Sequence, residues 1–403
     1  MSEFSFKLFL IFTLLVFLRP QELFPWLGVI PLAKVFAGGA LLSYFIQRSG
    51  EFPLLLKEKE SKILIALLIL IILTIPFALW PGGSVNAFFE SFFQTFLTYF
   101  MIIGIVNSYE KVMKVIWVIT ISIGVYALFG FIDHIQGVSH AFGRVGGRAQ
   151  GLYGNPNDLA IILCLSIPFI FLLIKITKQG IKRFFLYGII VINLAVIVFT
   201  YSRTGMIALG IIFLGLLAKS RKKLRGALIL AIVIIVLVSV GGERFTERAA
   251  SIFDDSKDEV GSRQTRVNLL ETGIRAFWNS PFIGVGLGNF VNMEGTSWYM
   301  AHNGYIEIAV EHGILGLVLY LGLLCSMLLN LRRMQRLLSV KGTLLNEYYL
   351  CQFLEIDMWT YFVIVMFSTP FGWIFFYLLG FTVSMRKWLA SKIISGQGAP
   401  GLD

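Results

Sequence analysis

The chain has 403 residues, of which 57% are hydrophobic and 14% are charged. Soluble globular domains are nearer a quarter charged, so this composition excludes an ordinary soluble protein. The formal net charge of +11 is compatible with nucleic-acid binding, but the basic residues follow the pattern of a membrane protein. We therefore expect membrane lipid, and no nucleic acid, among the partners.

Twelve apolar runs, separated by short charged segments, follow one another along the chain. Several reach about 18 residues, the length with which a helix spans a bilayer. We predict an all-α polytopic membrane protein, a single membrane domain over residues 1–403 with about 12 transmembrane helices. The runs are 4–18, 23–46, 63–80, 85–106, 112–132, 159–174, 184–200, 205–218, 226–240, 303–329, 348–367 and 371–385.

Two features of the apolar runs bear on processing and redox chemistry. The first run is followed by RPQELFPW rather than by a small-residue cleavage site, so we expect a retained helix and no signal peptide. The cysteines, Cys164, Cys325 and Cys351, lie in or beside apolar runs at spacings that suit neither a metal site nor a disulfide framework. We expect them to serve in packing.

Lys and Arg residues are concentrated in alternate connections between the runs. If the N-terminus is cytoplasmic, strongly basic connections such as 175–183 and 219–225 lie on the cytoplasmic side. An excess of Lys and Arg marks that side of a membrane, so the positive charge predicts topology first and contact with anionic lipid second. The segments 133–156, 201–204 and 241–302 are then extracytoplasmic.

The connection 241–302 contains three segments of different character. ERFTERAASIFDDSKDEVGS is expected to begin as a short helix and then become irregular, with acids that are solvated rather than metal-binding. In RQTRVNLLETGIRAFWNS, the residues Val267, Leu270, Ile274 and Phe277 recur at helical spacing, which predicts an amphipathic helix at the membrane interface. GVGLGNF precedes no βαβ unit, so we reject a dinucleotide-binding loop.

Arg203, in VFTYSRTG, lies between two apolar runs at an extracytoplasmic boundary. It is either an arginine that extends from a helix end into the interface or a clamp for phosphate, which guanidinium groups bind bidentately. Asn155, in YGNPND, is expected to cap the following helix, and sugar binding is a further possibility. Arg148 and Arg144 flank glycines and either bind phosphate or are solvated.

Two arginines of the expected amphipathic helix are candidates for ligand contact. Arg266 and Arg275 are nine residues apart, which places them on opposite faces of a helix. Glu271 precedes Arg275 by four residues, so a surface ion pair is the alternative for Arg275. Arg266 has no acid at helical spacing and is the better candidate.

The stretch WYMAHNGYIEIAVEHGILGL begins the tenth run. Asn303 is expected to cap its helix, with Glu307 and Glu311 following on the same face at intervals of four. Negative charge near a helix N-terminus is favourable, which accounts for Glu307 better than for Glu311. His302 is either an interfacial or capping residue, or a general base that nearby arginines keep neutral.

The motifs TYSRTG, GLYGNPNDLA, TRVNLLETGIRAFWNSPFIGVGLGNF and AHNGYIEIAVEHGILGLVLYL resemble those of the O-antigen ligase and O-antigen polymerase family of bacterial envelope glycosyltransferases. His302 and Gly313 match that family's closing motif of a histidine, ten residues and a glycine. The resemblance implies an inner-membrane enzyme that transfers a glycan from undecaprenyl diphosphate to an acceptor hydroxyl at the periplasmic face, without metal, nucleotide or other cofactor. By motif position, Arg203 and Arg266 correspond to diphosphate-contacting arginines and His302 to a general base.

On this resemblance we expect an inverting, metal-independent O-antigen ligase with lipid A–core as acceptor. The connection 241–302 is shorter than in many ligases, so a polymerase that extends lipid-linked glycan remains an alternative. A transporter is the alternative of another class, and apolar runs almost free of charge, with Lys34 and Glu90 as the main exceptions, argue against it. The predicted catalytic residues are His302, Arg203 and Arg266, and the predicted substrate-binding residues are Arg275, Arg148, Asn155, Asn303 and Glu307.

Overall fold

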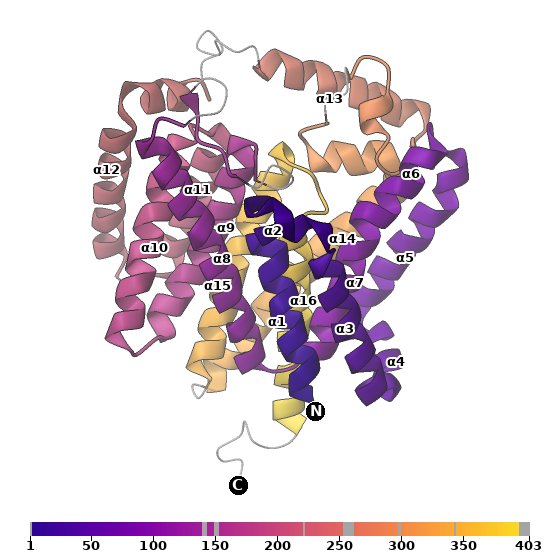
Figure 1. Ribbon diagram of the computed structural model, residues 1–403, viewed down its shortest axis with the longest axis horizontal. Coiled ribbons are helices and arrows are strands. Elements are labelled where there is room, and N and C mark those ends of the chain that lie inside the picture. Colours follow the sequence, from indigo (N-terminus) through magenta and orange to yellow (C-terminus); the bar gives the residue numbers. More distant parts are fainter. Residues whose placement is uncertain are drawn as a thin grey trace. The chain divides into compact units, whose positions relative to one another are not determined.

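The computed structural model describes residues 2–138, 143–148, 153–220, 222–252, 262–296, 300–341 and 344–394, which form helices and connections without a β-strand. The chain divides into two compact units. Unit 1 comprises Met1–Ser43, Tyr109–Glu259 and Leu338–Thr360, and unit 2 comprises Tyr44–Ser108, Val260–Leu337 and Tyr361–Asp403. Each unit is therefore built from segments that are distant in the sequence, as the colours in Figure 1 show.

Unit 1 is a bundle in which α9 is the most enclosed helix. Its helices are α1 (Ser2–Leu18), α2 (Pro20–Leu23), η1 (Pro25–Val29), the first part of α3 (Leu32–Arg48), α8 (Tyr109–Ile135), α9 (Pro156–Ile176), α10 (Gly180–Phe199), α11 (Arg203–Lys219), α12 (Lys223–Ala250) and most of α15 (Leu345–Ile364).

The sequence of α9 is apolar on every side, which is typical of a helix that other helices surround. It packs against α8, α10 and α11, and its side chains are buried along most of its length. One polar contact lies within this packing, where Asn193 Nδ2 of α10 donates to Ser166 Oγ of α9 at 2.8 Å. The bond offsets the cost of burying that amide nitrogen.

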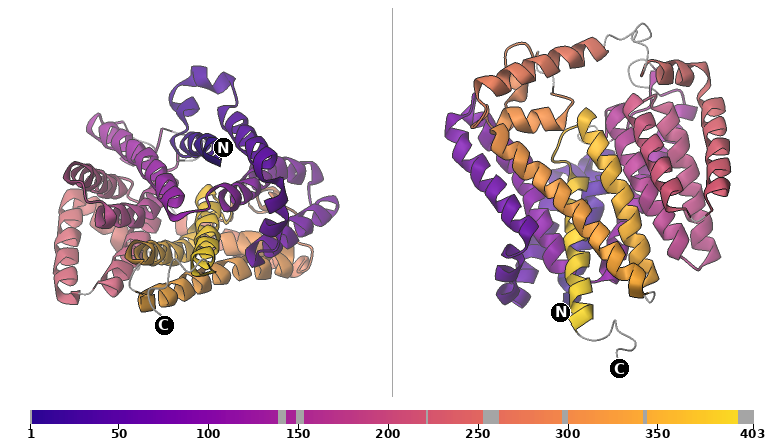
Figure 2. Two further views of the ribbon diagram at one scale, coloured as in Figure 1. Left: turned by 90° about the horizontal axis from the view of Figure 1, so that it is seen from below. Right: turned by 180° about the vertical axis from the view of Figure 1, so that it is seen from behind.

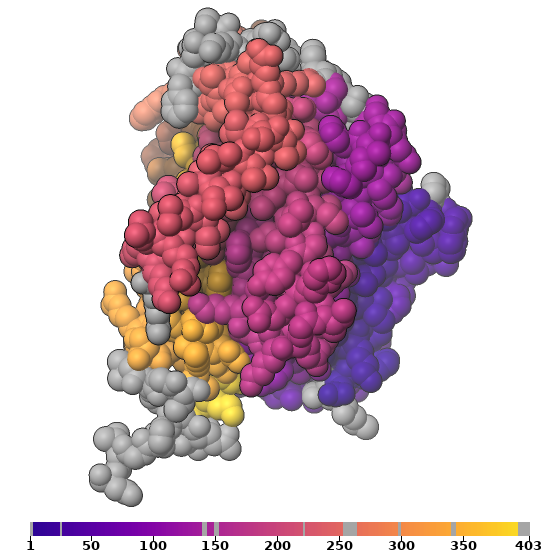
Figure 3. All heavy atoms as spheres, turned by 90° about the vertical axis from the view of Figure 1, so that its left-hand side faces the viewer, coloured from indigo at the N-terminus to yellow at the C-terminus, as the bar shows by residue number. Residues whose placement is uncertain are grey.

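α12 lies on the outside of unit 1, where it forms a separate ridge (Figure 3). One side contacts α10 and α11, and apolar residues such as Ile232, Ile235 and Val236 are exposed. Gly242, with φ of +63°, kinks the helix, which then continues to Ala250. This continuation confirms the short helix predicted at the start of the connection 241–302, whereas its acidic part, 254–259, lies outside the described residues.

Unit 2 contains the remaining elements, with α16 packed along α7. Its helices and turns are η2 (Ser49–Glu51), α4 (Phe52–Leu56), α5 (Lys59–Thr74), η3 (Ile75–Phe77), α6 (Pro81–Ala87), the π-helical turn η4 (Phe88–Phe92), α7 (Phe93–Ile105), α13 (Ser262–Asn279), η7 (Phe290–Asn292), most of α14 (Gly304–Lys341), η8 (Val365–Phe367) and α16 (Trp373–Ile394).

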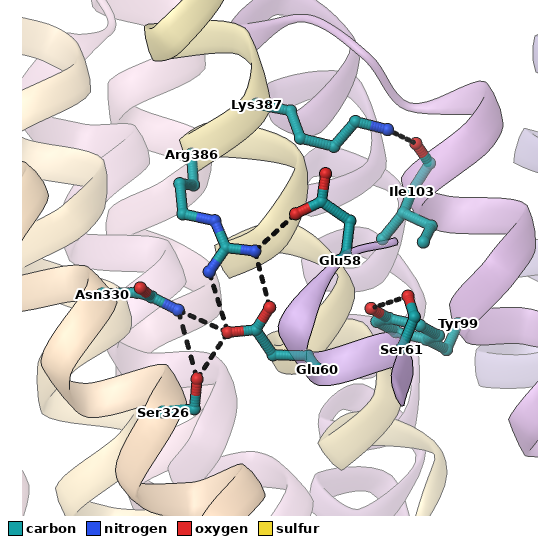
Figure 4. A network of polar contacts seen from close by, with 9 residues as sticks. All are labelled: Glu58, Glu60, Ser61, Tyr99, Ile103, Ser326, Asn330, Arg386 and Lys387. Carbon is teal, nitrogen blue, oxygen red and sulfur yellow. Dashed lines mark hydrogen bonds and ion pairs between the residues drawn. The ribbon is translucent and has the colours of Figure 1, made fainter. Parts of the chain in front are cut away.

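A buried polar network joins three helices of unit 2 (Figure 4). Glu60 of α5 is fully buried, and its carboxylate accepts two hydrogen bonds from Arg386 of α16, at 2.6 and 2.8 Å. Ser326 and Asn330 of α14 donate to the same carboxylate at 2.5 and 2.6 Å. Arg386 also bonds Glu58 at 2.7 Å. Because buried charges need partners, this network fixes how α5, α14 and α16 meet.

Each predicted apolar run coincides with a helix, which confirms the all-helical class. Among the described residues, eight helices are long and apolar enough to cross a membrane by length and composition. The remaining runs fall in α1, α3, α11 and α16, so the number of about 12 transmembrane helices stays a prediction. The eight are Lys59–Phe77, Pro81–Ile105, Tyr109–Ile135, Pro156–Ile176, Gly180–Phe199, Lys223–Ala250, Gly304–Ser339 and Leu345–Phe367.

The prediction that Lys34 and Glu90 are the main charges within the apolar runs is wrong. α3 begins only at Leu32, since the prolines before it interrupt a helix, and Lys34 therefore lies in the first turn. Inside α15, Glu355 pairs with Lys219 at 2.5 Å. Asp357 is fully buried, and neither of its carboxylate oxygens has a hydrogen-bond partner among the described residues.

The cysteines are free thiols. Cys164 of α9 and Cys351 of α15 are buried, and Cys164 Sγ donates to the carbonyl oxygen of Gly205 at 3.5 Å. The predicted packing role is confirmed for these two residues. Cys325 of α14 is exposed, which the sequence did not indicate.

Candidate functional site

A residue of the segment that leads into α14 has an unusual backbone conformation. His302 has φ of +47°, a left-handed conformation that is uncommon for residues other than glycine and that occurs preferentially at functional sites. Asn303 Oδ1 accepts hydrogen bonds from the backbone N–H groups of Tyr305, at 3.1 Å, and Ile306, at 3.3 Å. The predicted cap is confirmed, and only the Nδ2 group of Asn303 is left to serve a substrate.

The His302 imidazole is half-buried. Burial disfavours its charged form, and the positive charge of Arg266 acts in the same direction, so the pKa of His302 lies below its ordinary value of 6.5. The neutral form therefore predominates near pH 7, as a general base requires. The sequence predicted that nearby cations keep His302 neutral, and in the structure burial is the larger cause of its lowered pKa.

Glu307 lies in the first turn of α14, where its backbone N–H donates to the carbonyl oxygen of Asn303 at 2.9 Å. Its Oε2 atom is buried and has no hydrogen-bond partner among the described residues. A buried carboxylate oxygen without a donor costs free energy. Glu307 is therefore a candidate acceptor for a substrate hydroxyl at the end of α14 that carries His302.

α14 is kinked at Gly313, so that its first part turns away from the long remainder (Figure 2). Gly313 has φ of +66°, and a Cβ there would lie 2.5 Å from the carbonyl oxygen of Phe282. The kink frees backbone carbonyl groups of α14, which accept hydrogen bonds from Val285 and Gly286 at 2.9 and 3.0 Å. The glycine of the family motif therefore allows the segment 281–290 to bond to the break in the helix.

Glu311, fully enclosed one turn after Glu307, has its partners in the same segment. The backbone N–H of Phe290 donates to its Oε1 at 3.1 Å, and those of Gly288 and Asn289 also bond the carboxylate. Successive N–H groups in a turn form a concave anion-binding site. GVGLGNF thus binds a carboxylate of the chain itself, which explains both its glycines and the presence of Glu311 below the first turn.

α13 has two apolar faces rather than the single one that was predicted. Its inner face contributes Leu269 to a hydrophobic cluster with Phe290, Ala301 and Val310, and Ala276 and Phe277 pack against that cluster. The other residues of the predicted stripe, Val267, Leu270 and Ile274, are exposed. They lie on a different side of the helix from Leu269. This outer stripe consists of Val267, Leu270, Ile274 and Trp278, which is 72% exposed.

The two arginines of α13 differ in their surroundings. Arg266 is half-buried, and its charge reaches His302. Arg275 is exposed, in agreement with the prediction that the two point to opposite faces. Unit 2 therefore brings together Arg266 and His302, with Asn303 and Glu307 at the same end of α14, and leaves Arg275 apart from them.

In unit 1, Arg203 is the first residue of α11 and is half-buried. Ser202 caps this helix, since its Oγ accepts from the backbone N–H of Gly205 at 3.2 Å. Tyr201, just before the cap, is left-handed with φ of +47°. The guanidinium of Arg244 lies 4.6 Å from the centre of the Tyr201 ring, a cation–π contact. The sequence did not single out Arg244, because its partner is distant along the chain.

Hydrogen bonds hold the segments GNPND and TYSRTG together. Asn157 Oδ1 accepts from Ser202 Oγ and from Arg144 Nη2, both at 2.8 Å. Arg144 Nε donates to the Thr200 carbonyl oxygen at 2.8 Å. Asn155 Oδ1 accepts from the backbone N–H of Asn157 at 2.8 Å, which confirms the predicted cap of α9. These side chains order the surroundings of Arg203, and a role of Asn155 in substrate binding stays a prediction.

Arg148 is engaged by Asp133 near the end of α8. Its Nη2 atom lies 2.6 Å from Asp133 Oδ1, and its Nε atom donates to Oδ2 at 3.1 Å. The hydrogen bonds to Asp133 raise the pKa of Arg148 above its usual range, and the guanidinium lies 4.7 Å from the centre of the Phe129 ring. An arginine held in this way is better suited to fixing its loop than to binding phosphate, so its substrate-binding role stays a prediction.

Arginines and a neutral imidazole are thus the groups of these two sites that can act on a substrate. Within the described part of the chain, no group of three or more His, Cys, Asp or Glu residues is placed to hold a metal ion. Guanidinium groups suit phosphate, and a neutral imidazole suits proton abstraction.

A comparison with protein families identifies one of them in the chain. Residues 188–321, which include Arg203, Arg266, His302 and Gly313, match the model of a family described as O-antigen ligase. A comparison with curated proteins gives no match. The family match confirms the resemblance that the motifs indicated. Residues 188–321 of the chain are therefore similar to the O-antigen ligase family.

Proposed function

We propose that this protein transfers a glycan from undecaprenyl diphosphate to a hydroxyl group of an acceptor sugar, at the periplasmic face of the bacterial inner membrane. The observation that carries the proposal is His302, which stands in a left-handed conformation with a lowered pKa under the influence of Arg266. A strained, neutral imidazole beside a phosphate-binding group is what a base-assisted displacement needs.

In the proposed reaction, an imidazole nitrogen of His302 takes the proton of the acceptor hydroxyl. The oxygen forms a bond to the anomeric carbon as the bond from that carbon to the diphosphate oxygen breaks. The electron pair stays on the diphosphate, and Arg266 stabilises the charge that develops there. Because no covalent enzyme intermediate forms, the anomeric configuration inverts.

Glu307 has a distinct role in this proposal. Its buried Oε2 atom accepts a hydrogen bond from an acceptor sugar hydroxyl and so aligns the acceptor. Asn303 contributes its Nδ2 group to the same sugar. Orientation of this kind lowers the entropic part of the barrier.

Arg203 is proposed as a second phosphate-binding arginine. It begins α11 within the TYSRTG motif, and its surroundings in unit 1 are fixed by the Ser202 and Asn157 bonds. The strain at Tyr201 supports a functional role for this turn. A guanidinium suits the task because its planar donors match phosphate oxygens and its charge persists at every working pH.

The periplasmic connection 241–302 is proposed to rest on the membrane surface through α13. Its exposed stripe of Val267, Leu270, Ile274 and Trp278 is apolar, and tryptophan is enriched at membrane–water interfaces. Arg266, one turn before Leu270 and at the edge of this stripe, is then held near the level of lipid phosphate groups. This placement suits a donor that is itself anchored in the bilayer.

Reconstitution in liposomes with an undecaprenyl-diphosphate-linked glycan tests the proposal. We expect transfer to lipid A–core, with inversion of the anomeric configuration by NMR and no loss of rate in a metal chelator. Ladders of longer lipid-linked glycan would identify a polymerase instead. Absence of transfer with every acceptor sugar would contradict the proposal.

One observation favours the alternative of a transporter. Asp357 is buried in α15 without a hydrogen-bond partner among the described residues, and intramembrane carboxyl groups often mark ion pathways. Uptake of the lipid-free glycan into liposomes, abolished in Asp357→Asn and accompanied by no transfer, would identify transport. We expect Asp357→Asn to retain transfer.

A further inference from the structure

A cavity of about 270 Å³ lies among α9, α11 and α15 of unit 1. Its polarity changes along the helices. Phe171, Leu216 and Ile356 form apolar walls, while Lys175 and Lys219 line the cavity about one turn nearer the ends of α9 and α11. One turn of helix is about 5.4 Å, so the cationic groups lie toward one end of a cavity to which Ile174 and Phe353 add further apolar lining.

Both lysines are held by neighbouring side chains of unit 1. The Lys175 ammonium lies 3.9 Å from the centre of the Tyr349 ring. Lys219 Nζ lies 2.5 Å from Glu355 Oε2, and Glu355 is buried whereas Lys219 is partly exposed. An ammonium group has three N–H donors, so Lys219 can bond Glu355 and a further anion at the same time.

Neutral donors and nearby charges complete the polar level of the cavity. Ser220 and Gln352 line it beside the lysines. Gln352 Nε2 donates to the hydroxyl group of Tyr348 at 3.0 Å. The connections that follow α9 and α11 add further basic residues, among them Lys178 and Lys222. These lysines add positive charge to the connections beside the cavity.

We propose that this cavity binds an anionic phospholipid. The phosphate of the headgroup contacts Lys175 and Lys219, and the first carbons of an acyl chain contact Phe171, Leu216 and Ile356. The cavity is slightly smaller than the roughly 300 Å³ at which ligand cavities usually begin, so it holds part of the lipid while the rest of the chains stays in the bilayer. Basic sites between membrane helices on the cytoplasmic side are suited to anionic headgroups. The proposal is independent of glycosyl transfer.

Thermal unfolding of the purified protein in micelles tests the site, with dioleoylphosphatidylglycerol, dioleoylphosphatidylcholine or inorganic phosphate added separately. We expect phosphatidylglycerol to raise the unfolding temperature and the other two to leave it unchanged. In Lys175→Gln, the apparent affinity for phosphatidylglycerol should fall about fivefold, the effect of one lysine near an anionic lipid surface. Lys182→Gln is the matched control, because Lys182 is an exposed lysine of the same basic region outside the cavity.

A second variant and a second measurement address the apolar part of the site. Leu216→Trp fills the cavity without changing charge, and native mass spectrometry counts the phosphatidylglycerol molecules that each variant retains. The wild type and Lys182→Gln should retain one more lipid than Lys175→Gln or Leu216→Trp. Equal stabilisation by both lipids, an equal effect of inorganic phosphate, or unchanged lipid retention in both cavity variants would overturn the proposal.

Discussion

In addition to burial, which is the larger cause, the positive charge of Arg266 of α13 lowers the pKa of His302, two residues before α14. The two residues are separated in sequence by the glycine-rich segment, yet unit 2 brings their side chains within electrostatic reach. This relationship gives the arginine two effects in the proposed reaction. It stabilises charge on the diphosphate, and it keeps the base unprotonated.

The pH dependence of transfer follows from this relationship. His302 acts when neutral, so kcat/KM should rise with pH through the pKa of His302, and this rise should lie below pH 6.5 because the pKa is lowered. In Arg266→Met, loss of the positive charge raises the pKa, and the rise in kcat/KM should move to higher pH. The rate at its plateau should also fall about 10²–10³-fold, as for loss of a transition-state donor. Arg275→Met, on the exposed face, should leave the pH profile in place, and an unshifted profile in Arg266→Met would contradict the proposed coupling.

Replacing His302 should abolish most of the transfer without unfolding the protein. His302→Asn is the sharpest variant, because asparagine tolerates the left-handed conformation at this position. Loss of a general base costs about 10²–10⁴-fold in kcat. His134→Asn is the control, since the His134 ring stacks on Phe199 in unit 1, with 3.6 Å between the ring centres. Transfer by His302→Asn at the wild-type rate, with normal membrane insertion, would exclude His302 as the base.

The kink in α14 predicts opposite effects for two glycine substitutions in the same helix. Gly313→Ala places a Cβ against the Phe282 carbonyl at φ of +66°, and such strain costs about 1–3 kcal/mol. Gly322→Ala meets nothing within 4 Å, so alanine should stabilise the helix by about 0.5–1 kcal/mol. Thermal unfolding of the two variants in one detergent measures the difference. If both substitutions proved neutral, the account of the kink would be wrong.

Local signals predicted the parts of this molecule that depend on neighbouring residues. The apolar runs locate the helices, and the caps Asn155 and Asn303 occupy the positions that their spacing to the next helix indicates. The family motif points to Gly313, whose positive φ is a conformation that favours glycine. Such features follow from helix periodicity and capping, which a sequence records directly.

Features that depend on distant partners were not predictable in the same way. Asp133 forms an ion pair with Arg148, and a backbone N–H group of GVGLGNF donates a hydrogen bond to Glu311. The partners in each pair are not close in sequence. The sequence also did not show which face of α13 is buried, because two of its faces are apolar. The packing of Leu269 in the cluster distinguishes them. A spacing pattern shows which residues share a face, but tertiary contacts decide which face is buried.

A double-mutant cycle tests whether Arg203 and Arg266 act on one diphosphate. If both guanidinium groups stabilise the same developing charge, the losses of Arg203→Met and Arg266→Met in kcat/KM should not add. Residues that act on one group show coupling energies of about 0.5–3 kcal/mol. Arg203→Met with Arg275→Met supplies the reference, and these losses should add. Additive losses in the first pair would show that Arg203 does not act on the diphosphate that Arg266 binds.

The network around Glu60 predicts where unit 2 is most sensitive to loss of one cation. Arg386→Ala removes two of the donors to a fully buried carboxylate, and breaking a buried ion pair costs about 3–5 kcal/mol. Ser326 and Asn330 still donate to Glu60, so we expect the lower end of that range. Arg48→Ala is the control, because its pair with Glu51, at 3.2 Å, is exposed and should contribute less than about 1 kcal/mol.

The double variant Arg386→Met with Glu60→Met should be more stable than Arg386→Ala, since it leaves no buried charge without a partner. Thermal unfolding of the four proteins distinguishes these cases, and a double variant less stable than Arg386→Ala would show that the network stabilises unit 2 through the ion pair itself.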